Sequence, residues 1–300
     1  MRKIPVITFA HHKGGTGKTT SCLNVAGFLQ KLGKRVLVMD LDPQANATSG
    51  LGVDPHTLTL SIYDLFMGQF EGFPDVAIQD VVSETRSGVF LAPSTLDLVG
   101  IEPFLYNIEH RAVVLKKILS RDRPDYDFIL IDTPPSMGQL VINGLIAADH
   151  TVVTFDRGIF ALHGLDTLLT IFSDIEELLG EHVSPDMAIL TRWDDPDKEG
   201  KPGMLSRLTG HFKKQDPEVA RDKEQLKTFE AEVRARFTDV FIIPYNREIY
   251  EAQNAGLPIS HFAPDCEAAK AYRKIAGAIS GWKDEKGRVP AETDGGQESL

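Results

Sequence analysis

A chain of 300 residues with 42% hydrophobic residues is long enough to bury the core of one large α/β domain. Its two cysteines, Cys22 and Cys266, lie far apart and form no Cys-x-x-Cys pair, which argues against a disulfide framework, a structural zinc site or an iron–sulfur cluster. Both are expected to pack in helices. The net charge of −11 opposes attraction to nucleic acid, so any basic surface has to be local.

The N-terminal part of the chain has the pattern of a phosphate-binding loop. An apolar run, Val6–Ala10, predicts a strand, and Thr20–Leu32 has the apolar spacing of a helix that ends at Gly33. Between them lies the sequence HHKGGTGKTT. Its glycines at positions 14, 15 and 17 leave backbone N–H groups free to close around phosphate oxygens.

Two side chains complete the predicted loop. Lys18 adds a positive charge, and Thr19 supplies a hydroxyl where a Mg²⁺ ligand would lie, at a helix N-terminus that itself favours anions. The loop therefore predicts a site for a nucleoside triphosphate. The alternative, a chance glycine-rich turn, is disfavoured by the strand before the loop and the helix after it.

The loop departs from the ordinary motif in a specific way. G-x-x-x-x-G-K-[ST] requires a glycine where this chain has His12, and a second lysine, Lys13, precedes the glycine pair. K-G-G-T-G-K-T-T resembles the deviant Walker A form of the ParA/Soj/MinD ATPases, and the resemblance extends from Ile4 to about Ile279. It implies a three-layer α/β fold of the P-loop NTPase type, with a mostly parallel, twisted β-sheet flanked by helices.

A second strand, Arg35–Met39, delivers Asp40 and Asp42 at its C-terminal end, where ligands lie in parallel sheets. Two carboxylates beside a triphosphate can hold Mg²⁺ through waters and position an attacking water. The alternative is a polar turn. The resemblance implies that Asp42 orients the hydrolytic water and that Asp40 lies nearer the metal. Residues 46–52 are expected to form a mobile polar loop.

The middle of the chain carries a second nucleotide signature. Ser61–Phe70 and Asn107–Ser120 are spaced as helices, and a short strand and turn are expected at 90–95. The strand Phe128–Ile131 then leads to Asp132, at the Walker B position, where a carboxylate can hold a Mg²⁺-bound water opposite Thr19. Residues 133–136 resemble the second switch of the family. A short helix, a strand at 150–155, a helix at 162–179 and a strand at 187–191 follow.

Beyond position 193 the resemblance weakens. Residues 194–237 are expected to form a charged, helical insertion, with the helical part at 205–237. From 198 to 236 it holds ten basic and seven acidic residues. The insertion could face DNA or a partner, although a solvated helix pair of mixed charge is the commoner explanation.

The last predicted strand, Val240–Ile243, precedes Pro244 and Asn246. The resemblance implies that this P-x-N turn lies against the adenine, which an amide can pair with through both donor and acceptor. Tyr245 and Glu248 stand where relatives more often carry arginine, which weakens the transfer of their DNA contacts. A basic patch for tracking phosphates is expected from Arg247 and from the last helix, 266–279, with ordinary surface charge as the alternative; the patch residues are Arg247, Lys270, Arg273 and Lys274.

The chain is expected to form a single P-loop ATPase domain over 1–280. The tail, 281–300, holds three basic and five acidic residues among Gly and Pro, so it is expected to be disordered. It has no apolar stripe for a membrane-binding helix, and no run reaches the roughly 18 apolar residues of a membrane span. The start of the chain also lacks a signal-peptide pattern. We therefore expect a cytoplasmic, nucleoid-associated protein without membrane contact.

These observations lead to one functional expectation. The resemblance implies a slow, Mg²⁺-dependent ATPase of the ParA/Soj type that partitions a chromosome or plasmid, dimerises on binding ATP, binds DNA without sequence preference and is stimulated by a ParB-like partner. The catalytic residues would be Lys13, Lys18 and Asp42, and the metal site Thr19, Asp40 and Asp132. The nucleotide would contact Lys13, Gly14, Gly15, Thr16, Gly17, Lys18, Thr19, Thr20, Pro244 and Asn246.

Several alternatives stay open. A nucleoid-based ATPase that positions a protein cargo has the same chemistry, and a MinD-like membrane-cycling ATPase is the less favoured relative. A reductase or metal-cluster carrier of this fold needs paired cysteines, and a metabolic ligase would not need Lys13. A DNA-binding module without enzymatic activity is hard to reconcile with the intact Lys18, Thr19, Asp42 and Asp132.

Overall fold

The computed structural model describes residues 4–122, 125–136, 138–156, 161–183, 185–192 and 217–282. The strands are β1 (Val6–Ala10), β2 (Val36–Asp40), β3 (Ser83–Glu84), β4 (Phe90–Ala92), β5 (Phe128–Asp132), β6 (His150–Asp156), β7 (Pro185–Thr191) and β8 (Asp239–Ile242). The helices are α1 (Lys18–Lys31), α2 (Asn46–Gly50), α3 (Ile62–Met67), α4 (Ile78–Val81), α5 (Ile101–Tyr106), α6 (Val114–Asp122), α7 (Gln139–Ala147), α8 (Ala161–Leu179), α10 (Pro217–Arg236), α11 (Arg247–Asn254), α12 (Ile259–Phe262) and α13 (Glu267–Ile279). Short 3₁₀ helices occupy Pro55–Thr57, Leu96–Gly100 and Arg111–Val113.

These eight strands form one sheet in the order β3-β4-β2-β5-β1-β6-β7-β8. All neighbouring strands in it pair in parallel except β3, which runs antiparallel to β4 at the edge. β1 lies near the middle, between β5 and β6. Because the strands are parallel, the segments that follow them meet at one edge of the sheet, which is where ligands bind in such folds. The expected mostly parallel sheet flanked by helices is confirmed.

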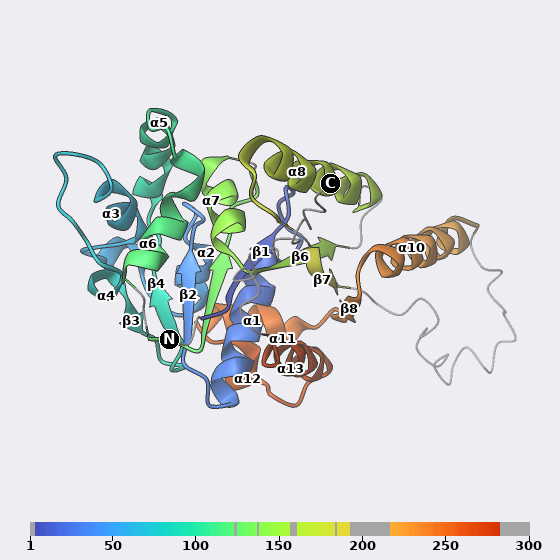
Figure 1. The fold of residues 1–300 in the computed structure, drawn as a ribbon. Coiled ribbons are helices and arrows are strands. Elements are labelled where there is room, and N and C mark those ends of the chain that lie inside the picture. The colour runs from blue at the N-terminus through green and yellow to red at the C-terminus, as the bar shows by residue number, and fades with distance from the viewer. Residues whose placement is uncertain are drawn as a thin grey trace, which may run out of the picture.

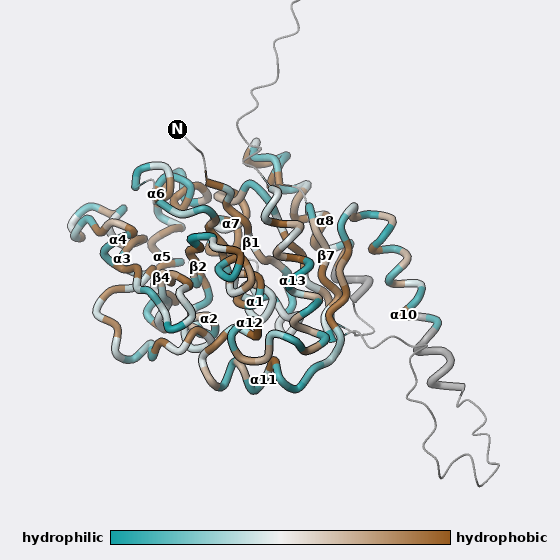
Figure 2. Tube along the Cα trace, turned by 90° about the horizontal axis from the view of Figure 1, so that it is seen from below, coloured by the Kyte–Doolittle hydropathy of each residue, from teal (hydrophilic) through white to brown (hydrophobic). Residues whose placement is uncertain are grey.

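Helices cover both faces of this sheet. Figure 1 shows α11, α12 and α13 gathered beside α1, on the opposite side of the sheet from α7 and α8. The strands are apolar on both sides, since alternate residues such as Ile7 and Val6 enter different hydrophobic clusters. In Figure 2, β1 and β7 are coloured as hydrophobic, whereas much of α10 is coloured as hydrophilic. A third cluster joins α7 and α8 to the C-terminal half of α10 through Phe229 and Val233.

α1 is buried around most of its circumference because it lies between the sheet and the C-terminal helices. Its residues 21–29 are all buried. α12 comes so close to α1 that a side chain at Gly27 would overlap Pro258 and Ser260. Asn24 holds the same contact through its Oδ1, which accepts a hydrogen bond from the Ile259 N–H at 2.6 Å. The C-terminal helices are thereby fixed to the helix that begins at the phosphate-binding loop.

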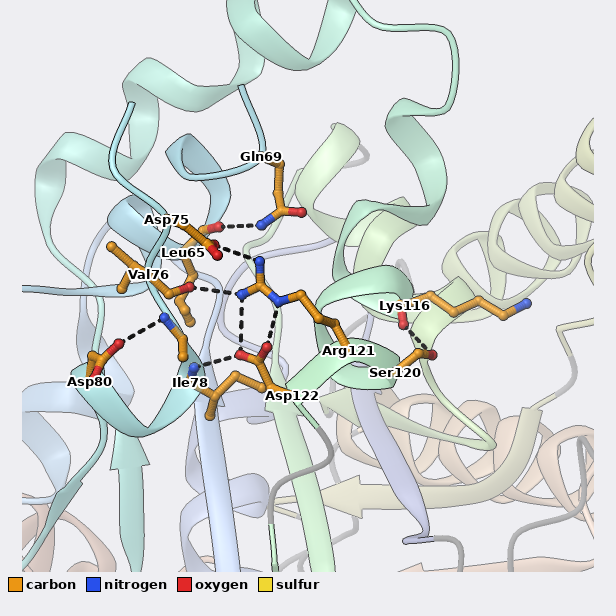
Figure 3. Close-up of polar contacts among 11 residues, drawn as sticks. Leu65, Gln69, Asp75, Val76, Ile78, Asp80, Lys116, Ser120, Arg121 and Asp122 are labelled. Atoms are coloured by element: carbon orange, nitrogen blue, oxygen red, sulfur yellow. Dashed lines mark hydrogen bonds and ion pairs between the residues drawn. The ribbon is translucent and has the colours of Figure 1, made fainter. Parts of the chain in front are cut away.

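A polar network holds the far end of α6 against the segment before α4 (Figure 3). The Arg121 guanidinium donates to Asp75 at 2.6 Å, to the Val76 carbonyl at 2.9 Å and to Asp122 at 2.5 Å. Asp122 in turn accepts from the Ile78 N–H at 2.7 Å. The network lies away from the carboxyl edge of the sheet, so we read it as scaffold.

Most predicted elements are confirmed within about two residues, but some expectations need correction. The helix expected at 107–120 begins only at Val114, after a 3₁₀ turn, and the one expected at 61–70 ends at Met67. Residues 46–52 are not a mobile loop, because Asn46–Gly50 forms α2 and packs into the fold. The first helix begins at Lys18, two residues earlier than expected. Cys22 lies buried in α1 as expected, but Cys266 is the half-buried residue before α13, and its Sγ accepts from the Ala269 N–H. Of the expected insertion, 217–236 is α10; residues 193–216, and the tail from 283, lie outside the described residues.

The close approach of α1 and α12 predicts the effect of a single methyl group. Gly27→Ala forces the two helices apart, so we expect it to lower the free energy of unfolding by about 1–3 kcal/mol. Gly277 in α13 has open space where its Cβ would lie. Gly277→Ala should therefore be neutral or stabilise by up to about 1 kcal/mol through helix propensity. Denaturant unfolding of both variants checks this, and equal losses would contradict the proposed packing.

Candidate nucleotide-binding site

The phosphate-binding loop runs from the end of β1 to the start of α1. Gly15 and Gly17 have φ values of +77° and +91°, a region that glycine adopts without steric cost. Gly17 is the residue before α1, and no side chain among the described residues caps the helix there. The N–H groups of the first turn therefore stay available to an anion, which the helix N-terminus favours.

A second constraint explains the glycine at position 17. A Cβ there would lie 2.8 Å from Cγ2 of Thr191, the last residue of β7. Glycine is thus required both by the backbone conformation and by the approach of the neighbouring strand. On the other side, a Cβ at Gly14 would be in ordinary contact with Pro135, at 3.6 Å. The loop is therefore enclosed between β7 and the segment that follows β5.

Lys18 points back across the loop that precedes it. Its Nζ donates to the Lys13 carbonyl at 3.2 Å, and the residue is 6% exposed. Burial lowers the pKa of the Lys18 ammonium, while the carboxylates of Asp132 and Asp42 act in the opposite direction. The loop thus holds a buried cation whose neighbours are two carboxylates.

Two histidines precede Lys13, and His11 holds the Lys13 backbone. His11 Nδ1 accepts a hydrogen bond from the Lys13 N–H at 2.9 Å, and burial lowers the pKa of His11 to about 3. The ring is therefore neutral at physiological pH, as an accepting Nδ1 requires. His12 stacks on it with ring centroids 4.6 Å apart. In the sequence, His12 stands out only as the residue that replaces the motif's glycine, and no local pattern indicates the role of His11.

Asp40 is buried, and both of its carboxylate oxygens are engaged. Oδ1 accepts from the Asp42 N–H at 3.1 Å, and Oδ2 accepts from the N–H and hydroxyl of Thr48 at 2.8 and 2.7 Å. Burial raises the pKa of Asp40 to about 7 despite these hydrogen bonds. The carboxylate therefore anchors α2 to the end of β2, a contact that sequence reasoning missed.

Asp132 differs from Asp40 although the two are paired across β2 and β5. Its side chain is fully buried, and neither oxygen has a hydrogen bond of good geometry with a residue that the structure describes. Burial raises the pKa of Asp132 well above its usual value, and the charge of Asp40 adds to the rise. The Thr19 hydroxyl and the Lys18 ammonium lie close enough to act on this pKa in the opposite direction. A buried carboxylate that has no well-formed hydrogen bond and lies beside Thr19 and Lys18 suits a bound cation or the water that such a cation holds.

Asp42 lies between these groups and the following turn. It is 5% exposed, and its Oδ1 accepts from the Gln44 N–H at 2.9 Å. In the described part of the chain, no cluster of three or more His, Cys, Asp or Glu side chains could hold a metal ion by itself. The donors here instead suit Mg²⁺ held jointly by phosphates, a hydroxyl and waters.

Pro244 and Asn246 follow β8, the edge strand beyond β7. Asn246 is the N-cap of α11, and its Oδ1 accepts from the Glu248 N–H at 2.8 Å, which leaves the amide NH₂ for other contacts. α11 is tied to the loop helix, because Gln253 Nε2 donates to the Thr20 hydroxyl at 3.1 Å.

The predicted DNA residues lie on α11 and α13, but acidic residues accompany them. Arg247 pairs with Glu251 at 3.0 Å, and Lys270 pairs with Glu267 at 2.8 Å. Arg273 donates to the Pro264 carbonyl at 3.1 Å. From position 247 to 279 the chain holds four basic and four acidic residues. The structure thus places the expected basic residues at exposed positions on a surface without net charge.

Comparison with known proteins agrees with this geometry. A family model described as an AAA domain matches residues 4–184. The chain is 34% identical over 274 residues to the chromosome-partitioning ATPase Soj of Treponema pallidum, covering 91% of this chain and 96% of that protein. It is 33% identical over 279 residues to the sporulation initiation inhibitor protein Soj of Bacillus subtilis, covering 92% and 98%.

Solved structures share the fold. Cobyrinic acid a,c-diamide synthase from Mycobacterium smegmatis, with bound ATP analog and magnesium, is 26% identical with a TM-score of 0.70, covering 92% of this chain and 94% of that one. The ATP complex of McdA from Cyanothece has a TM-score of 0.71 at 23% identity, covering 95% and 99%, and supports the fold alone. None of the described helices has the length and apolar character needed to cross a membrane.

The raised pKa of the buried Asp132 carboxyl predicts a gain in stability when the group is neutralised. A carboxyl whose pKa is raised in the folded state does not lower the free energy of unfolding at pH values below its unfolded pKa of about 4. As the pH rises from there to the folded pKa, the free energy of unfolding falls. We therefore expect Asp132→Asn to raise the free energy of unfolding of the nucleotide-free protein by about 1–3 kcal/mol at pH 8, and by less at pH 5.

Denaturant titrations at the two pH values measure this change. Asp97→Asn is the matched control, because Asp97 is exposed and its substitution should change little at either pH. A loss of stability in Asp132→Asn at pH 8 would show that Lys18 and Thr19 outweigh the cost of burying the charge, which contradicts the raised pKa.

Proposed function

Because the chain belongs to the ParA/Soj/MinD family of P-loop ATPases, we propose that it is a partition-type switch which ATP converts from a monomer into a DNA-binding dimer. The observation that carries this proposal is the loop itself. Lys13 precedes a glycine-lined loop whose helix N-terminus is uncapped, and Lys18 lies buried beside Asp132 and Asp42. That arrangement suits a triphosphate, and Lys13 is the second lysine that distinguishes the deviant form of the loop.

Residues around the loop would divide the binding of Mg²⁺-ATP. The N–H groups of residues 14–20 and the Lys18 ammonium would hold the phosphates, for which Lys18 exchanges its bond to the Lys13 carbonyl. Thr19 and Asp132 would hold Mg²⁺, Asp132 through a water. When bound, Mg²⁺ neutralises the charge that develops on the phosphates. Asp40, engaged by Thr48, would keep α2 and the Asp42 backbone in place rather than contact the metal directly.

Hydrolysis in this proposal is a matter of positioning, without a covalent intermediate. Asp42 would orient the attacking water, and Lys18 together with the loop N–H groups would stabilise the transferring phosphoryl group. Lys13 would reach the phosphates of a second copy, so that the nucleotide lies between two protomers. Turnover of such a switch is slow, and a ParB-like partner would stimulate it.

The dimer would bind DNA without sequence preference at the surface of α11 and α13. Because Glu251 and Glu267 pair with basic residues there, a single copy offers little net attraction to phosphates. Two copies joined by ATP would double the number of phosphate contacts. The proposed place of action is therefore the nucleoid, within the cytoplasm, and the proposed cargo is a chromosome or plasmid.

Two variants separate dimerisation from hydrolysis. Lys13→Ala should keep ADP binding but lose the ATP-dependent dimer, because the lysine that contacts the partner's nucleotide is gone. Asp42→Ala should keep the dimer and lower ATP turnover by about 100-fold or more, because the water loses its positioning group. Light scattering with ATP or ADP, together with phosphate release, measures both effects.

Lys117→Ala is the control, since Lys117 is an exposed lysine on α6. It should dimerise and hydrolyse ATP as the unmodified protein does. Normal dimers formed by Lys13→Ala would refute the role across the dimer, and unchanged turnover in Asp42→Ala would refute the role in hydrolysis.

A further inference from the structure

Two successive residues at the end of β7 donate hydrogen bonds to backbone carbonyls of the phosphate-binding loop. Thr191 Oγ1 donates to the Thr16 carbonyl at 3.0 Å, and Arg192 Nη2 donates to the Gly15 carbonyl at 2.6 Å. The two acceptors are likewise successive residues of the loop. In a loop that uses its N–H groups for an anion, the carbonyls turn the other way and need donors of their own.

The Arg192 guanidinium is itself held in a fixed orientation. Asp156, the last residue of β6, accepts from Nε at 3.0 Å and pairs with Nη2 at 2.6 Å. Such a two-point, charge-assisted contact fixes the planar guanidinium in a way that a lysine ammonium cannot. Gly15 is therefore linked through Arg192 to the ends of two neighbouring strands.

The backbone of Arg192 is unusual as well. Its φ is +53°, and among the described residues only Ala45 is another non-glycine with positive φ. A side-chain-bearing residue is disfavoured in this conformation, and such outliers persist where the surrounding structure enforces them. Here the conformation turns the chain at the end of β7 and brings the guanidinium to the Gly15 carbonyl. Arg192 thus combines a disfavoured backbone conformation, an ion pair with Asp156 and a hydrogen bond to the loop.

We propose that Arg192 is a positioning residue for the nucleotide, which orders the Gly15 carbonyl so that the loop N–H groups already face the phosphates before binding. Preorganisation of this kind strengthens binding because less ordering remains to be done when the ligand arrives. Arg192 then acts on affinity, and the step at the γ-phosphate is left to Lys18 and Asp42. The inference rests on the proposed function only in requiring that the loop binds a nucleotide.

The test is Mg²⁺-ADP binding to the monomer, measured by calorimetry. Arg192→Asn removes the guanidinium and keeps a residue that tolerates positive φ. We expect its Kd for ADP to rise about tenfold, because one charge-assisted hydrogen bond that orders the loop is lost. The kcat at saturating ATP should fall less than twofold. Arg192→Lys should recover part of the affinity. Asp156→Asn should weaken binding, and the double variant should be no weaker than Arg192→Asn.

Arg234→Gln is the matched control. Arg234 pairs with Glu230 at 2.8 Å, and its side chain is 50% exposed against 53% for Arg192, but it lies on α10. Its Kd should equal that of the unmodified protein. An unchanged Kd in Arg192→Asn, or a loss confined to kcat, would overturn the inference; if that variant does not fold, the Kd of Arg192→Lys decides by the same criterion. Failure of the unmodified protein to dimerise with ATP would instead refute the proposed function and leave the effect on ADP binding standing.

Discussion

Two aspartates buried side by side are the constraint on which this site depends. β2 and β5 pair in register, so Asp40 and Asp132 end adjacent strands at the same level of the sheet. Two carboxylates in a dry interior repel each other and lose hydration, and burial raises the pKa of both. At Asp40, hydrogen bonds from Thr48 offset part of this cost. At Asp132 the pKa remains well above its usual value, which suits a cation that arrives with the nucleotide.

The order of the strands turns this constraint into a site. β1 lies next to β5, so the loop after β1 brings Lys18 and Thr19 to the buried carboxylate of Asp132. On the other side of β1, β6 and β7 supply Asp156 and Arg192. Arg192 pairs with Asp156 and donates to the Gly15 carbonyl of the loop. Because Asp40 also anchors α2, a change at the metal side of the site can be transmitted to the segment that follows Asp42. In the proposed function, nucleotide binding and switching would thus use the same buried carboxylates.

The sequence was sufficient to predict what depends on local pattern. The spacing of glycines around Lys18, the apolar strands and the aspartates that end β2 and β5 have physical meaning within a few residues, and the structure brings them together. α2 was not predictable in this way. It is short and polar, and the hydrogen bonds from Thr48 that hold it in place go to Asp40, at the end of β2.

Contacts between distant segments explain other omissions. Arg192 meets Gly15 across 177 residues, so no local pattern indicates it. The neutral character of the α11 and α13 surface is different, because it could have been found in the sequence. Glu251 lies one helical turn after Arg247, and Glu267 one turn before Lys270, which are the spacings at which helical side chains pair. Counting basic residues alone overstated the attraction of this surface for DNA.

The most direct test of a nucleotide-switched DNA-binding ATPase is to measure binding to a nonspecific DNA duplex with ATP, with ADP and without nucleotide, over a range of salt concentrations. We expect binding only with ATP, at protein concentrations that support the dimer, and a steep loss of affinity with salt because the contacts are to phosphates. Equal binding in all three nucleotide states would contradict the switch. A stable ATP dimer that binds no DNA at low salt would contradict DNA as its partner.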